Sequence, residues 1–283
     1  MRLLITIFIC CLSAVSYTQV APIPDANNGI TKLQVQLEKI FAGKWTNVEV
    51  DNLGNLYLVD DQQRIKKLNN RYDSVGTFNE VRTVGTLHSI DVSNPLRIIL
   101  WYKGFGTLLL LDRFLQVKTS IDLRNIGLLQ CNAVAQSYDN NIWVYDDLSA
   151  QIKKINEEGK VLLESPDMRV LYDAPPHPQT LTDFNRNLYA YDADNGLLIC
   201  DYFGAVQKRL LYKGWKNLQG FGRGLLATNE DVVTWLSSNG IDTKKWELPA
   251  GWWDAQKIRF YQNKVYVLRN NQLYAYALTQ ALE

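Results

Sequence analysis

Histidine and cysteine are scarce in this chain, and neither sign of charge dominates it. Its 283 residues include two His and four Cys, and 30 Lys and Arg face 29 Asp and Glu. Balanced charge argues against a nucleic-acid partner, because the phosphate backbone attracts a basic surface. The motifs HExxH, GxSxG and CxxC and a glycine-rich phosphate loop are also missing, so no common catalytic motif indicates an enzyme. We expect no cofactor.

Long apolar runs are missing as well, apart from a short one at the N-terminus. Arg2 precedes an apolar stretch over residues 3–12, and residues 13–18 are small or polar. This order is typical of a secretory signal peptide, and the run is too short to span a bilayer. We predict a signal peptide over residues 1–18, no transmembrane segment, and an exported protein of the periplasm or cell surface.

The predicted mature chain keeps only two cysteines, Cys131 and Cys200. Two cysteines in a chain of this length do not make a disulfide framework. We expect both to be small buried hydrophobic residues instead.

The chain contains an internal repeat of short strands. Residues 45–78 alternate apolar and polar positions, with turn residues between the runs. Such alternation predicts four strands. Residues 131–163 repeat the order, with NIWVYDD in place of NLYLVDD and QIKKINEEG in place of RIKKLNNRY, and NLYAYD at 187–192 begins a third copy. Four short strands recurring about every 40 residues are typical of propeller blades.

The period predicts an all-β, six-bladed β-propeller rather than a β-sandwich or barrel. The blades are expected at 45–78, 86–123, 130–163, 178–211, 217–248 and 255–278. The last blade has only three strands, and residues 33–41 alternate as its missing outer strand would. The N-terminal strand would then close the ring and cover the exposed sheet edge. The domain would span residues 33–283, after a mobile lead over 19–32.

The first copy of the repeat, at residues 45–78, resembles NHL-repeat proteins of the six-bladed propeller superfamily. Asp51, Gly54, Asn55, Tyr57 and Asp60 match the pattern D-x-x-G-N-x-Y-x-x-D of that family. The other blades keep fewer of these residues. The resemblance implies the fold and no particular activity. The leader and the aromatic strands look similar to exported proteins of Bacteroidetes-type bacteria, which place propellers around secretion and uptake machines.

Four loops place aromatic residues on one face of such a propeller, at 102–106, 172–179, 212–215 and 249–254. Aromatic side chains bury much area at low entropic cost, so such a face would hold a protein partner. The alternative is that the rings turn inward and fill the gaps between blades. The candidate binding residues are Tyr102, Lys103, Phe105, Tyr172, His177, Tyr212, Lys213, Trp215, Trp252 and Trp253.

Non-catalytic binding of a protein partner, with the chain as a subunit of an envelope secretion or uptake complex, is the leading functional hypothesis. Two alternatives stay open. A glycan-binding module would use the PAGWWD loop. A metal-dependent hydrolase resembling six-bladed lactonases would hold a divalent cation in the channel through oxygen ligands. Its candidate ligands are Glu49, Asn132, Asn217 and Asp254.

Overall fold

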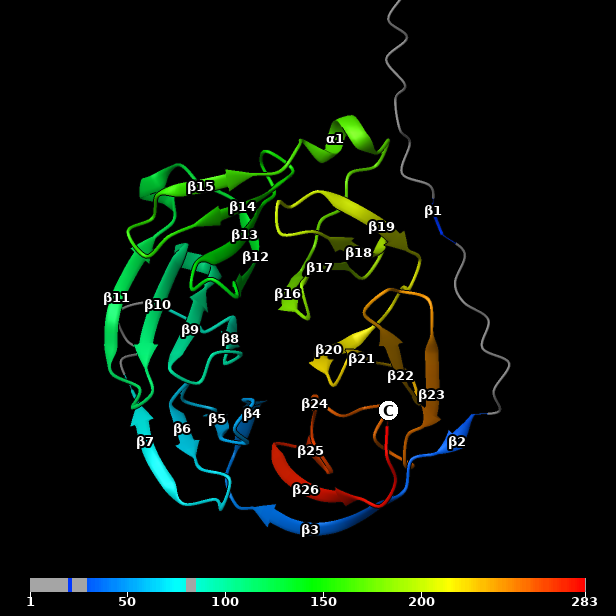
Figure 1. The fold of residues 1–283 in the computed structure, drawn as a ribbon. Helices are drawn as coiled ribbons and strands as arrows, with labels where there is room; N and C mark the ends of the chain where they lie inside the picture. Colours follow the sequence, from blue (N-terminus) through cyan, green and yellow to red (C-terminus); the bar gives the residue numbers. More distant parts are fainter. Residues whose placement is uncertain (1–19, 22–29, 80–84, 283) are drawn as a thin grey trace, which may run out of the picture.

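A computed structural model describes residues 20–21, 30–79 and 85–282. Six four-stranded sheets form a ring around a central axis, as Figure 1 shows. The predicted six-bladed β-propeller is therefore confirmed. In the described part of the chain, no helix is long and apolar enough to cross a membrane.

Each blade is an antiparallel meander that starts at its innermost strand. Blades one to three contain β4 (Trp45–Val50), β5 (Leu56–Asp60), β6 (Ile65–Leu68), β7 (Ser74–Phe78), β8 (Ser89–Asp91), β9 (Arg97–Tyr102), β10 (Thr107–Asp112), β11 (Val117–Asp122), β12 (Cys131–Gln136), β13 (Ile142–Asp146), β14 (Gln151–Ile155) and β15 (Val161–Glu164). Blades four to six contain β16 (Thr180–Phe184), β17 (Asn187–Asp192), β18 (Gly196–Cys200), β19 (Val206–Leu210), β20 (Lys216–Phe221), β21 (Gly224–Asn229), β22 (Val232–Ser237), β23 (Thr243–Glu247), β24 (Lys257–Tyr261), β25 (Lys264–Arg269) and β26 (Gln272–Leu278). The predicted blade order is confirmed.

The N-terminal strand β3 (Val35–Phe41) supplies the fourth strand of blade six. It runs antiparallel to β26, with Phe41 opposite Leu273 and Val35 opposite Leu278. The predicted closure of the ring is confirmed, and Figure 1 shows β3 at the outer edge of that blade.

The chain before β3 also contacts the outer strands of two blades. β1 (Val20–Ala21) pairs in parallel with β19, and β2 (Thr31–Lys32) pairs in parallel with β23. The predicted signal peptide, and most of the predicted lead, lie outside the described residues.

The NHL-like motif residues before Asp60 form one hydrogen-bonded turn. The buried Asp51 carboxylate accepts hydrogen bonds from the backbone amides of Leu53 and Asn55, from Asn55 Nδ2 at 2.7 Å and from the Tyr57 hydroxyl at 3.1 Å. Gly54 adopts φ +78° in this turn, a conformation that suits glycine. The motif therefore stabilises the hairpin between β4 and β5.

Buried apolar side chains fill the space between neighbouring blades. Cys131 packs between blades two and three, and Cys200 packs between blades three and four. Both thiols are free and buried, as predicted, and burial raises the pKa of Cys131 to about 12. A thiol with so high a pKa is unreactive at neutral pH, since the thiolate is the reactive form.

Carboxylates also stabilise the other acidic turns. Asp60 accepts from the amides of Gln62 and Arg64, each at 2.9 Å. Asp192 accepts from the amides of Asp194 and Asn195. The DADNG segment at 192–196 is therefore a hairpin turn, in keeping with its content of strong turn-forming residues.

Candidate binding face

One end of the propeller carries all four aromatic loops. In a four-stranded meander, the turn between the second and third strands lies at the same end as the connection to the next blade, because the strands alternate in direction. We call this end the loop face. The opposite face carries the other turns of each blade.

Four of the predicted binding aromatics are buried within or between the blades. Tyr102, Tyr212, Trp215 and Trp252 are each at most 7% exposed. The prediction that these rings form an exposed rim is wrong. Tyr102 is the last residue of β9, and the other three rings lie in the connections between blades. All four pack within the hydrophobic clusters between neighbouring blades, where burial of their large apolar area stabilises the fold.

The contacts of these rings show how they fill the gaps. Tyr212 stacks on Trp215 with ring centroids 4.2 Å apart. The backbone amide of Trp215 donates to the Tyr191 hydroxyl at 2.5 Å. The ring centroid of Trp252 lies 4.8 Å from that of Tyr276, between blades five and six. These residues contribute to the stability of the scaffold.

The other candidates remain accessible but lie on different blades. Phe105 is 50% exposed at the blade-two turn, and Trp253 is 64% exposed between blades five and six. Lys103 and Lys213 are exposed as well. Tyr172 is half-buried, with the Arg209 guanidinium 5.0 Å from its ring centre. The structure therefore does not gather them into one aromatic patch.

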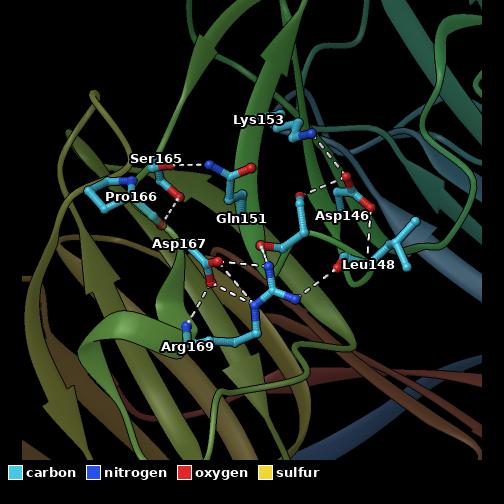
Figure 2. A network of polar contacts seen from close by, with 9 residues as sticks. Asp146, Leu148, Gln151, Lys153, Ser165, Pro166, Asp167 and Arg169 are labelled. Carbon is cyan, nitrogen blue, oxygen red and sulfur yellow. Dashed lines mark hydrogen bonds and ion pairs between the residues drawn. The ribbon is translucent and has the colours of Figure 1, made fainter.

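A polar network fixes the connection between blades three and four, as Figure 2 shows. It includes the short helix α1 (Met168–Leu171), whose N-cap Asp167 accepts from the Arg169 amide at 2.8 Å. The Arg169 guanidinium donates to the Asp167 carboxylate at 2.7 and 3.0 Å and to the carbonyls of Leu148 and Ser149 at 3.3 Å. The helix is thereby attached to the turn between β13 and β14.

The predicted binding residue His177 is attached to the same region. Its Nδ1 lies 2.6 Å from an oxygen of Asp147, and its backbone amide donates to Asp192 at 2.7 Å. The Tyr145 hydroxyl donates to the carbonyl of Pro176 at 2.5 Å. His177 thus anchors a proline-rich loop to blades three and four, while its imidazole stays exposed at the surface.

Four apolar side chains are exposed on this part of the loop face. Val170 is 83% exposed and Leu129 is 63% exposed, and Leu148 and Leu171 are exposed beside them in the same loops. Their segments are joined by the Arg169 bond to Leu148 and by the Asp147 amide, which donates to the Gln130 carbonyl at 2.8 Å. We call Leu129, Leu148, Val170 and Leu171 the blade-three patch.

Sequence reasoning missed this patch because it searched the loops for aromatic rings. A signal was present: Leu129, Leu148 and Val170 are apolar residues in loops, where polar residues are usual. The proximity of three loops could not be read from the sequence, because it depends on how blades two, three and four pack.

The central channel contains a buried ion cluster between blades six and one. Glu49 of β4 accepts from Arg259 Nε at 2.5 Å and Nη2 at 3.0 Å, and it pairs with Lys257 Nζ at 2.9 Å. Burial by itself raises the pKa of Glu49, but the charges and hydrogen bonds of Arg259 and Lys257 outweigh it and lower that pKa to about 2. Glu49 is thus a charged residue that links the first and last blades.

The candidate ligands of the hydrolase hypothesis do not form one site. Glu49 is neutralised by its two cations. Asn217 accepts from the Ile258 amide at 3.1 Å and donates to Thr228 at 2.9 Å. Asp254 pairs with Arg269 at 3.3 Å, and Asn132 lies at a bulge in β12. Over the described residues, no group of three His, Cys, Asp or Glu is arranged to hold a metal ion.

No protein-family model and no curated protein sequence matches this chain. Solved propeller structures do match it. Virginiamycin B lyase from Staphylococcus aureus is 11% identical with a TM-score of 0.61, over 87% of this chain and 100% of that one. BBS1N, solved in complex with ARL6DN, is 10% identical with a TM-score of 0.59, over 89% and 99%.

A further match is PorZ, an essential bacterial surface component of the type-IX secretion system of Porphyromonas gingivalis. It is 13% identical with a TM-score of 0.55, and the match covers 84% of this chain and 33% of PorZ. At such identities the likeness shows the fold alone. Fold and comparisons together define the chain as a six-bladed β-propeller, whose structural neighbours include a lyase, a secretion-system component and a protein solved in complex with a partner.

Proposed function

We propose that this chain is an exported, non-catalytic propeller that binds a protein partner through its loop face. The observation that carries the proposal is the blade-three patch, in which four apolar side chains are exposed on loops fixed by Arg169 and His177. Exposed apolar residues on neighbouring loops are typical of interaction sites, because covering them removes apolar surface from water.

The polar groups of the channel support a binding role over the hydrolase alternative. The Glu49 carboxylate is already paired with Arg259 and Lys257, and the Asn217 side-chain oxygen accepts from the Ile258 amide, so both groups have partners within the fold. A hydrolase of the proposed type needs several oxygens that converge on one point.

An envelope complex is the partner assembly we propose. The likeness to PorZ, a bacterial surface component of a secretion system, and the leader-like sequence of residues 1–18 both support an exported scaffold. N-terminal sequencing of the mature protein tests the export step. The expected first residue lies close to Gln19, and a mature chain that begins at Met1 would contradict export.

Capture of partners from the native envelope tests the binding step. Leu129→Asp places a charge in the blade-three patch, whereas Leu96→Asp places the same charge on the opposite face at a residue that is equally exposed, at 63%. We expect Leu129→Asp to weaken capture by about 30-fold or more, as for a central interface residue, and Leu96→Asp to change it little. Equal capture by both variants would refute the proposed face.

A further inference from the structure

A pocket of about 320 Å³ opens on the loop face at the connection between blades five and six. Buried Leu33 and Leu248 form part of its lining, and Trp253 lies beside them with most of its ring in solvent. The pocket is also lined by three charged residues, Asp231, Glu247 and Lys32. The pocket lies on different blades from the blade-three patch and is separate from it.

The loop geometry explains why Trp253 is exposed while its neighbour is not. Trp252 is buried between blades five and six against Tyr276. Its amide donates to the Pro249 carbonyl at 3.1 Å, and its carbonyl accepts from the Ala255 amide at 3.0 Å. Burial of Trp252 in this tight turn leaves Trp253 to face solvent at the pocket. The turn therefore fixes the backbone that carries the Trp253 indole.

The two carboxylates of the pocket have no cationic partner within the described residues. Asp231 and Glu247 form no ion pair there, although Lys32 lies opposite Glu247 in the β2–β23 pairing. The two strand ends that carry them are joined by the Leu248 amide, which donates to the Asp231 carbonyl at 2.6 Å. The pocket therefore combines an aromatic ring, an apolar lining and a net negative charge.

We propose that this pocket receives a lysine or arginine side chain from a polypeptide partner. The aliphatic stem of such a side chain would lie along Leu33 and Leu248, as long cationic side chains often do on apolar surface. Its charge would meet the Trp253 ring and the carboxylates of Asp231 and Glu247. A cation over an indole contributes about 0.5–1 kcal/mol at an exposed site, and a charge-assisted hydrogen bond to a carboxylate adds to it.

Charge complementarity favours a cation over a neutral sugar. A sugar would contact Trp253 and accept or donate hydrogen bonds, but it would leave the net negative charge of Asp231, Glu247 and Lys32 uncompensated. A basic side chain compensates it and also contacts the ring. This inference rests on the proposed function only in taking the ligand to be part of a polypeptide.

Titration of the full chain with short capped peptides tests the proposal. The probes are acetyl-Gly-Lys-Gly-amide and its arginine counterpart, with the N-acetyl-lysine peptide and methyl glucoside as neutral ligands. The readout is the indole N–H resonance of Trp253, assigned by its loss in Trp253→Phe. We expect saturable shifts with both basic peptides, weakening as salt rises, and no comparable shift with the neutral ligands.

Three variants locate the charge dependence. Asp231→Asn combined with Glu247→Gln should weaken binding of the lysine peptide at least fivefold, and Trp253→Ala should weaken it about two- to fivefold, measured by calorimetry. The matched control Lys32→Gln removes a positive charge from the same pocket and should strengthen binding. All four positions lie at the surface or rim, and thermal unfolding confirms that each variant is folded.

Two results would overturn the inference. Equal binding of the acetylated and free lysine peptides would show that charge is not recognised, and preferential binding of methyl glucoside would assign the pocket to glycans. The outcome is separable from that of the proposed function. Loss of envelope capture in Leu129→Asp with intact peptide binding leaves the pocket assignment standing, and the reverse pattern leaves the blade-three patch standing.

Discussion

Replacement of Glu49 by glutamine should destabilise the ring at the junction of its first and last blades. In Glu49→Gln, Arg259 and Lys257 remain side by side in the channel with no opposing charge. Removal of one partner from a buried ion pair typically costs about 3–5 kcal/mol. The lowered pKa gives a similar figure, because a shift from 4.5 to about 2 corresponds to about 3 kcal/mol at about 1.4 kcal/mol per unit.

A control variant separates this loss from a general effect of charge removal. Burial, followed by repulsion from Arg259, lowers the pKa of Lys257 despite the favourable charge of Glu49. Lys257 is therefore costly to hold as a cation, and Lys257→Met leaves the bidentate pair of Arg259 and Glu49 intact. We expect Lys257→Met to cost less than about 1 kcal/mol.

The assay is thermal and urea-induced unfolding at pH 7, monitored by circular dichroism and by tryptophan fluorescence. A loss of about 3 kcal/mol should lower the melting temperature of Glu49→Gln by about 6–9 °C in a domain of this size. A loss below about 1 kcal/mol, or an equal loss in Lys257→Met, would refute the argument that Glu49 links blades one and six electrostatically.

The same ion cluster predicts how stability depends on pH. The folded pKa of Glu49, about 2, lies below its unfolded value of 4.5. The stabilising contribution is therefore complete above about pH 5 and is lost as the pH falls from 4.5 toward 2. The wild type should lose more stability over this window than Glu49→Gln, which has no carboxyl to protonate at that position. Parallel pH profiles of the two proteins would contradict this prediction.

Four further variants test the turns and the loop that carries α1. Gly196→Ala should cost at least about 2 kcal/mol in urea unfolding, because φ is +93° and a Cβ would overlap the Leu210 carbonyl of the neighbouring strand β19. An unchanged midpoint would argue against the tight turn. Asp51→Ala should lower the free energy of unfolding by about 2–4 kcal/mol, because it leaves a buried tyrosine hydroxyl and two amides without their acceptor. Asp60→Ala, in a half-buried turn, should lower it by about 1 kcal/mol. A larger loss in Asp60→Ala than in Asp51→Ala would refute this ranking. Arg169→Ala should barely change the free energy of unfolding, because the side chain is exposed. The hydrogen of the Val170 amide should nevertheless exchange faster with solvent. An unchanged exchange rate would show that the polar network does not hold α1.

The sequence predicted the fold well because the information lies in local patterns. Alternation of apolar and polar residues defines a strand, and residues such as Asp51 and Gly54 define a turn within five positions. Repetition of these local patterns at a constant period implies the ring. The unpaired alternation at residues 33–41 and the three-stranded last blade together predicted the closure, which β3 and β26 confirm.

The candidate site was predicted only in part, because exposure depends on packing between blades. Trp252 and Trp253 are neighbours with the same side chain, yet one is buried and the other is 64% exposed. Composition assigns both to the same loop and cannot distinguish them. The tertiary structure decides, because the turn at 249–255 directs Trp252 into the gap between blades five and six, against Tyr276, and leaves Trp253 at the surface.

The sequence by itself therefore determined the number of blades, their boundaries and the way in which the ring closes. Only the tertiary structure decided which aromatic rings face solvent, that Glu49 meets Arg259 across 210 positions, and that hydrogen bonds join the loops of Leu129, Leu148 and Val170. The physical reason is one of range. Strand alternation and turn conformation act over a few residues, whereas burial and ion pairing depend on side chains that distant blades bring into contact.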